Sequence, residues 1–197
     1  MRIFVALDID DEIRRRITRF VEGVREFASD ARWVRPESMH ITLKFIGEKP
    51  PEAVEQIRAG LRTVRGTPFE LAFRGHGFFP TASSARVFWI GIEAGRELPD
   101  LAASVDASLT TLGIPREDRP FSPHLTLARG GGRSGSPKRQ KDDRRNSVFK
   151  KLQEKLVPMP QPQFGSMTAR AFYLYESKLG PGGSKYTKID SYPLASA

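Results

Sequence analysis

Hydrophobic residues recur at every third or fourth position in four segments of the chain, which is the period of an amphipathic helix. In the first segment, Ile13, Ile17 and Val21 form the apolar stripe, and Asp10 or Asp11 can cap its N-terminus. Four helices are therefore expected. They are predicted over residues 11–27, 51–64, 97–112 and 148–156.

Between these helices, alternating or wholly apolar runs rich in β-branched and aromatic residues predict β-strands. Strands and helices are interspersed along the whole chain, and no change of composition marks a boundary between domains. We therefore predict a single domain over residues 1–197, built from two intertwined lobes. The predicted strands cover residues 2–7, 32–34, 39–46, 69–73, 85–92, 123–128, 167–175 and 185–192.

Charge is distributed unevenly. The 197 residues carry a formal net charge of +9, which suits a polyanionic partner. Residues 133–151 contain eight lysines and arginines and two aspartates, so this stretch supplies two-thirds of the excess. Residues 130–146 also lack large apolar side chains, which predicts a flexible basic loop.

Composition also excludes some chemistries. The chain has no cysteine, which excludes disulfides, thiolate zinc sites and a cysteine nucleophile. The apolar start of the sequence is interrupted at Asp8 and Asp10, too early for a signal peptide. No apolar run approaches the roughly 18 residues of a membrane span. We expect a soluble cytoplasmic protein that contacts no membrane.

Two of the three histidines lie in near-identical tetrapeptides, His40-Ile41-Thr42-Leu43 and His124-Leu125-Thr126-Leu127. In a β-strand, residues i and i+2 point to the same face. Each tetrapeptide would therefore expose its histidine and threonine together and bury its two aliphatic residues. Two imidazoles and two hydroxyls at one site could bind and hydrolyse a phosphate ester without a metal.

The chemistry of these side chains fits that expectation. One neutral imidazole can accept a proton from water while a protonated one donates to a leaving alkoxide. Threonine hydroxyls, and Arg129 at the end of the second strand, can bind non-bridging phosphate oxygens. The alternatives are two unrelated strand histidines, or a zinc site, for which the motifs lack a third ligand.

These segments resemble the 2H phosphoesterases, and within them the RNA 2′,3′-cyclic phosphodiesterases, also called 2′-5′ RNA ligases. The resemblance extends over nearly the whole chain. It includes the opening strand at residues 2–7, the segments 33–48 and 121–129 around the two motifs, and Tyr175, Ser177, Leu179, Gly183 and Tyr186 near the end.

The resemblance implies a bilobal α+β fold in which two antiparallel sheets flank a central cleft and helices lie outside. It implies a metal-independent hydrolase that converts RNA 2′,3′-cyclic phosphate ends to 2′-phosphomonoesters and needs no cofactor. In that scheme His124 accepts a proton from water and His40 donates one to the departing O3′. Thr42, Thr126 and Arg129 would bind the phosphate. The motifs alone do not decide which histidine is the base.

Other functions remain open at this point. The same site could join a cyclic end to a 5′-hydroxyl as a 2′-5′ linkage, although abundant water favours hydrolysis. The chain could instead be a non-catalytic RNA-end-binding module, or act on another cyclic phosphate or a 2′-5′ oligonucleotide. We expect a monomer, and we expect the basic segment 130–146 to attract the RNA backbone.

The remaining histidine and the aromatic pairs have weaker implications. His76 lies between glycines, which suggests a turn and a structural or rim role. Phe78-Phe79, Phe88-Trp89 and Trp33 are expected in the core, although one or two could stack on a nucleobase.

Overall fold

A computed structural model describes residues 1–130, 148–181 and 183–195 of the chain. The predicted basic loop at 130–146, apart from Gly130, lies outside the described residues. Within the described part, no helix is both long enough and apolar enough to cross a bilayer.

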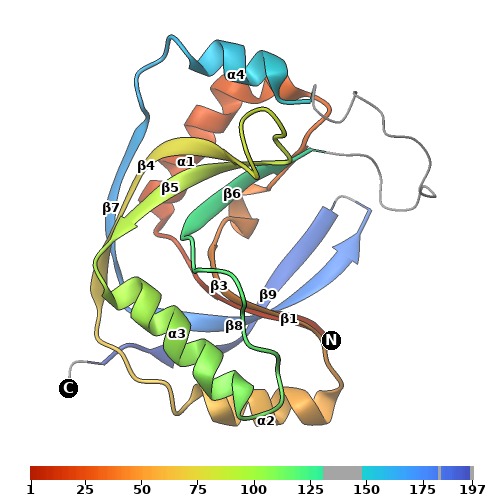
Figure 1. Ribbon diagram of the computed structural model, residues 1–197, viewed down its shortest axis with the longest axis vertical. Helices are drawn as coiled ribbons and strands as arrows, with labels where there is room; N and C mark the ends of the chain where they lie inside the picture. The colour runs from red at the N-terminus through yellow and green to blue at the C-terminus, as the bar shows by residue number, and fades with distance from the viewer. Residues whose placement is uncertain (131–147, 182, 196–197) are drawn as a thin grey trace.

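The described strands form two antiparallel sheets, which confirms that part of the expectation (Figure 1). The first sheet has the order β3-β1-β8-β9, from β1 (Arg2–Leu7), β3 (Ile41–Glu48), β8 (Ala171–Gly180) and β9 (Gly183–Pro193). The second has the order β2-β6-β5-β4-β7, from β2 (Arg32–Trp33), β4 (Phe69–Phe79), β5 (Val87–Ala94), β6 (His124–Arg129) and β7 (Gln163–Ala169).

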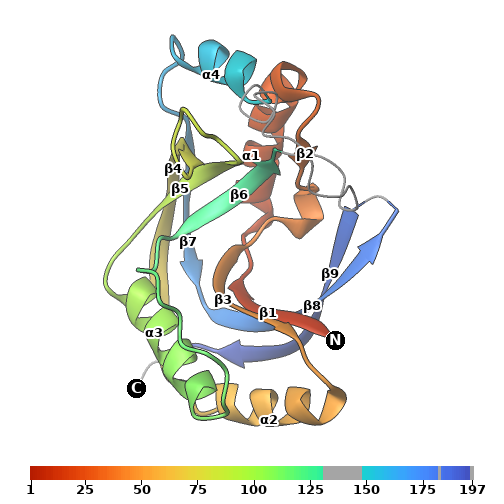
Figure 2. The same ribbon diagram turned by 45° about the vertical axis from the view of Figure 1, so that its right-hand side comes forward.

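The helices lie at the two ends of the molecule, outside the sheets (Figures 1 and 2). At one end, α3 packs against α2 and against β3, while at the other α1 packs against β7. This arrangement confirms the α+β class. The helices are α1 (Asp11–Val24), α2 (Pro51–Leu61), α3 (Glu97–Thr110) and α4 (Lys150–Leu156), with 3-10 turns η1 (Arg25–Ala28) and η2 (Pro36–Ser38).

The two faces of the first sheet differ. Ile3, Val5 and Leu7 are fully buried and belong to a hydrophobic core that continues through both sheets. The alternate residues Phe4 and Ala6 belong to a separate small cluster with Tyr175. Since residues i and i+2 share a face of a strand, the first sheet carries the main core on one face and this small cluster on the other.

One predicted strand was wrong in its extent. The segment 167–175 is divided at Arg170 into β7 and β8, which belong to different sheets. Ala169 pairs with Phe69 in one sheet, whereas Ala171 pairs with Pro193 in the other. The exposed Arg170 interrupts the hydrophobic run, and the buried positions change from Met167 and Ala169 before it to Phe172 and Leu174 after it. The pattern marks a break there, but it does not show that the chain passes between sheets.

The turn predicted at His76 was also wrong. His76 lies inside β4 and pairs with Ile90, and the register shifts between Phe73 and His76. Gly75 has φ +73° there, a conformation that glycine adopts without steric cost. The glycines therefore mark an irregularity within a long strand.

Candidate active site

The two His-Thr motifs lie where the two sheets approach each other. His40 directly precedes β3 and His124 begins β6, and these two strands are in contact. Thr42 pairs with Ala6 of the first sheet, and Thr126 pairs with Trp89 of the second. Each motif therefore belongs to a different sheet. The buried residues Ile41 and Leu125 alternate with the motif side chains, as the sequence predicts.

Both imidazoles are oriented by the same local hydrogen bond. His40 Nδ1 lies 2.7 Å from the carbonyl oxygen of Ser38, and His124 Nδ1 lies 2.8 Å from that of Ser122. A carbonyl can only accept, so Nδ1 carries the proton in each ring. The Nε2 atoms are left for chemistry: in the neutral ring Nε2 accepts a proton, and in the charged ring it donates one.

Hydroxyl groups accompany the reactive nitrogens. The Oγ1 atom of Thr42 lies 3.0 Å from His40 Nε2. Thr126 lies two residues after His124 on β6, so its side chain shares the face of that histidine. Both threonines are partly buried and can donate to a bound oxyanion.

Aromatic rings surround each imidazole. The His40 ring centroid lies 4.8 Å from that of Phe4 and 5.2 Å from that of Tyr186, which meets it edge-on. His124 meets Phe79 edge-on at 4.9 Å, and Trp89 lies 6.4 Å away. These contacts limit ring rotation and exclude water from part of each imidazole.

Sequence reasoning had not placed Phe4 and Phe79 beside the histidines. Residues 3–7 are apolar at every position, so the sequence of β1 does not show that Phe4 faces away from the main core. The pairing that brings Phe79 to His124 leaves no local pattern either.

Charge couples the two histidines to each other and to Arg129. Burial lowers the pKa of His40, and the positive charges of Arg129 and His124 lower it further. Burial and the charge of Arg129 also lower the pKa of His124. Hydrogen bonds to the carbonyls of Ser38 and Ser122 partly oppose these shifts. Three basic groups therefore lie near one another, and an anion bound among them would favour protonation of the imidazoles.

Asp8 is an acidic residue beside this basic group that the sequence had not singled out. Leu7 pairs with Ile41, so the next position along the register brings Asp8 beside His40. Its negative charge acts to raise the pKa of His40. Burial alone would raise the pKa of Asp8, but hydrogen bonds from Lys188 and Arg14 lower it, so the group stays a carboxylate.

Several other predicted residues lie outside the site. His76 packs against Phe78 and Phe88 on the core side of β4. Trp33 donates its indole N–H to the carbonyl oxygen of Ala28 and meets Phe88 edge-on, which makes it a structural residue. In each of the aromatic pairs Phe78-Phe79 and Phe88-Trp89, the second residue faces His124.

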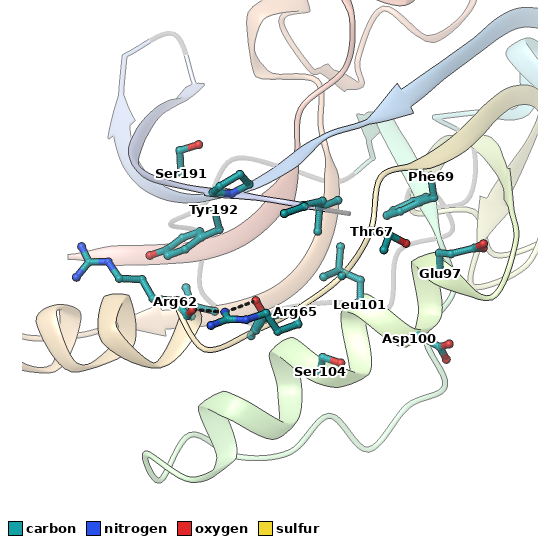
Figure 3. Close-up of a pocket in the computed structure, with 16 residues that line it drawn as sticks. Arg62, Arg65, Thr67, Phe69, Glu97, Asp100, Leu101, Ser104, Ser191 and Tyr192 are labelled. Atoms are coloured by element: carbon teal, nitrogen blue, oxygen red, sulfur yellow. Dashed lines mark hydrogen bonds between the residues drawn. The ribbon is translucent and has the colours of Figure 1, made fainter. Parts of the chain in front are cut away.

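A large hollow lies elsewhere (Figure 3). It is formed by α3 together with the C-terminal ends of α2 and β9. Its volume is about 850 Å³, and it contains no histidine. Arg62 and Arg65 line one part of it, and Glu97 and Asp100 another, so its charge is mixed. It offers no general acid or base suited to neutral pH. Cavity volume is therefore a poor guide to the chemistry of this protein.

Most groups gathered at the motifs are basic or hydroxylic, and such groups suit an anion. In residues 1–130, 148–181 and 183–195, no group of three or more histidine, aspartate or glutamate side chains is arranged to hold an ion.

Comparison with known proteins gives consistent results. The family model described as LigT like Phosphoesterase matches the chain twice, over residues 7–89 and 90–186, so that each match contains one motif. The chain is 38% identical over 189 residues to the RNA 2′,3′-cyclic phosphodiesterase of Archaeoglobus fulgidus, covering 96% of this chain and 98% of that protein. Identity to the RNA 2′,3′-cyclic phosphodiesterase of Methanothermobacter thermautotrophicus is 32% over 196 residues, covering 98% and 99%.

Solved structures agree with the sequence comparison. The crystal structure of E. coli LigT complexed with NADP+ superposes with a TM-score of 0.76 at 26% identity. The superposition covers 99% of this chain and 98% of that one. The arrangement of sheets and helices is thus shared over the full length.

Proposed function

The chain belongs to the LigT-like phosphoesterase family, and we propose on this basis that it hydrolyses RNA 2′,3′-cyclic phosphate ends to 2′-phosphomonoesters. The observation that carries the proposal is the matched pair of imidazoles, each with Nδ1 bonded to a backbone carbonyl, close enough for the charge of His124 to act on His40. Relatives at 38% and 32% identity bear the name of this activity.

The reaction needs one base and one acid. His124 Nε2 accepts a proton from water as the water oxygen attacks phosphorus. The bond from phosphorus to O3′ breaks, and His40 Nε2 donates a proton to the departing O3′. The product carries a 2′-phosphate and a 3′-hydroxyl. His124 then holds the extra proton and His40 lacks one, so exchange with solvent restores the starting state.

One feature of the surroundings distinguishes the two rings. Burial and the charge of Arg129 lower the pKa of both histidines, but the carboxylate of Asp8 opposes this shift at His40 alone. An acid must be protonated when the substrate is bound, and Asp8 favours the charged form of His40. This difference supports His40 as the acid and leaves His124 as the base.

Thr42, Thr126 and Arg129 complete the proposed site as phosphate-binding residues. Negative charge on the non-bridging oxygens grows as water attacks, and donors already in position stabilise it. Arg129 acts on the pKa of both histidines, which supports its nearness to a phosphate bound between them. RNA with a cyclic end is the proposed partner, and a cytoplasmic monomer remains a prediction.

Turnover of adenosine 2′,3′-cyclic phosphate in the presence of a chelator tests the proposal. We expect hydrolysis to adenosine 2′-phosphate alone, identified by chromatography against the 3′ isomer. The His40→Asn and His124→Asn variants should each lose about 10²- to 10⁴-fold in kcat. Binding without turnover would instead favour an RNA-end-binding module, and a strict requirement for added metal would contradict the mechanism.

A further inference from the structure

A large aromatic side chain lies exposed on the strand of the first motif. Phe45 of β3 is 52% exposed, whereas Ile41 and Leu43 on the same strand are buried in the core. Exposure of a phenylalanine in an otherwise well-packed strand has no benefit for folding. A contact with something outside the chain would account for it.

The ring of Phe45 lies on the face of the sheet that carries His40. Phe45 pairs with Phe4, whose ring contacts the imidazole of His40 at 4.8 Å. The next residue, Ile46, packs against the main core on the opposite face. Phe4 is therefore a neighbour of Phe45 through the strand pairing and of His40 through its ring.

A cation accompanies this ring. The guanidinium of Arg2 lies 5.2 Å from the centroid of Phe45, which is within cation–π distance. Arg2 precedes Phe4 by two residues and so shares its face. Within the described residues, Arg2 has no carboxylate partner in an ion pair. Glu48, which pairs with Arg2 in the ladder, contacts the N-terminal ammonium group at 3.0 Å instead.

An exposed ring beside an arginine matches the chemistry of single-stranded nucleic acid. Bases stack on aromatic side chains with little sequence preference, and arginine binds the adjoining phosphate. Phe45 lies three residues, about 10 Å, beyond Thr42 along the strand. A mononucleotide bound at the histidines does not need a contact there, but the next nucleotide of a chain can reach it.

We propose that Phe45 and Arg2 form a subsite for the nucleotide that precedes the cyclic end, in which its base stacks on Phe45 and its phosphodiester contacts Arg2. This inference rests on the proposed function, because it takes the cyclic phosphate to be bound at the histidines. It implies that the protein prefers an oligonucleotide to a mononucleotide, and a single-stranded end to a paired one.

A comparison of two substrates tests the subsite. The value of kcat/KM is measured for adenosine 2′,3′-cyclic phosphate and for the dinucleotide ApA with the same cyclic end. In Phe45→Ala we expect a 5- to 50-fold loss for the dinucleotide, in line with the value of one base stack, and a change of less than twofold for the mononucleotide. Phe45→Trp should keep the preference, and Arg2→Gln should weaken it and flatten its salt dependence.

A matched control removes exposed apolar surface elsewhere. Val157 is 83% exposed and directly follows α4, and α4 lies at the end of the molecule away from α2 (Figure 1). Val157→Ala should leave kcat/KM unchanged for both substrates. Equal effects of Phe45→Ala on both substrates, or no effect on either, would overturn the subsite.

A binding measurement separates this inference from the proposed function. Equilibrium constants are measured for adenosine 2′-phosphate and for ApA with a terminal 2′-phosphate, in the parent protein and in Phe45→Ala. A 5- to 50-fold weaker Kd for the dinucleotide alone supports the subsite whether or not the parent turns over cyclic phosphates. Equal Kd values for the dinucleotide in the two proteins reject it. Failure of the parent to hydrolyse either cyclic substrate would reject the function instead.

Discussion

The Nζ atom of Lys44 lies 2.5 Å from the Oδ1 atom of Asp106, in a buried contact between β3 and α3. The same Nζ donates to the carbonyl oxygen of Pro115 at 2.8 Å, and Asp106 Oδ1 accepts from the backbone N–H of Glu117 at 3.2 Å. Lys44 follows the first motif on its strand, and residues 115–117 begin the segment that leads to His124. This ion pair therefore connects the strand of one motif to the approach of the other.

Replacing Lys44 by methionine should destabilise the protein by about 3 kcal/mol, because the carboxylate of Asp106 would lose its buried partner. It would keep only the more distant contact with the exposed Arg116, whose Nε lies 3.6 Å from Oδ2. Urea unfolding followed by circular dichroism measures this loss. The double variant Lys44→Met, Asp106→Leu should regain part of the stability, since no buried charge is then unpaired. A double variant that is less stable by the sum of both single changes would show that the two residues act independently.

The threonine hydroxyls should matter for the transition state more than for binding. Thr42→Val and Thr126→Val keep the shape of the side chain and remove the donor, so we expect each to lower kcat by about 100-fold with a smaller change in KM. Serine at either position keeps a hydroxyl and should restore most of the rate. Single-turnover kinetics on the cyclic mononucleotide would show this. A pure KM effect would mean that the hydroxyls bind substrate and transition state equally.

Asp8→Asn should narrow the pH profile of kcat/KM. The carboxylate raises the pKa of His40, so its removal lowers that pKa, and the basic limb, which requires protonated His40, moves to lower pH. The acid limb, assigned to the base His124, should stay in place. Arg129→Gln should move both limbs to higher pH, because its charge lowers the pKa of both histidines. Movement of the acid limb alone in Asp8→Asn would reverse the two roles.

His76 provides a test of stability that is independent of the active site. Burial lowers its pKa from 6.5, so the unfolded state binds more protons than the folded state just below that pH. Stability is therefore complete above about pH 6.5 and falls as the pH drops towards the folded pKa. Nδ1 of His76 is also buried without a hydrogen-bond partner among the described residues.

The variant His76→Phe keeps an aromatic ring beside Phe78 and Phe88. It removes the buried group that becomes harder to protonate on folding, and it removes the Nδ1 atom that lacks a hydrogen-bond partner. We expect it to be more stable than the parent at pH 5.5 by about 1 kcal/mol, with a shallower fall in stability between pH 7.5 and 5.5. His40 and His124 keep a slope of the same sign in the variant. Chemical unfolding of the parent and the variant across this pH range measures the dependence of the free energy of unfolding on pH. An unchanged slope would mean that His76 does not contribute to the acid sensitivity.

Much of the local structure could be predicted because it follows from periodicity. The stripe of Ile13, Ile17 and Val21 is buried on α1, and the alternation around Thr42 and Thr126 holds on β3 and β6. The period of the hydrophobic pattern is a property of neighbouring residues, so a single segment contains all the information needed. The same alternation indicated which side chains of each motif face away from the core.

The sequence by itself thus determined the helices, most of the strands, the two His-Thr motifs and the types of chemistry they can perform. Only the tertiary structure decided that His124 lies near His40, that Asp8 stands beside one of them, and that the chain changes sheets at Arg170. These outcomes depend on pairings such as Ala6 with Tyr173, between segments far apart in the chain. Each strand has several apolar partners of similar pattern, and the choice among them depends on how all the side chains pack at once.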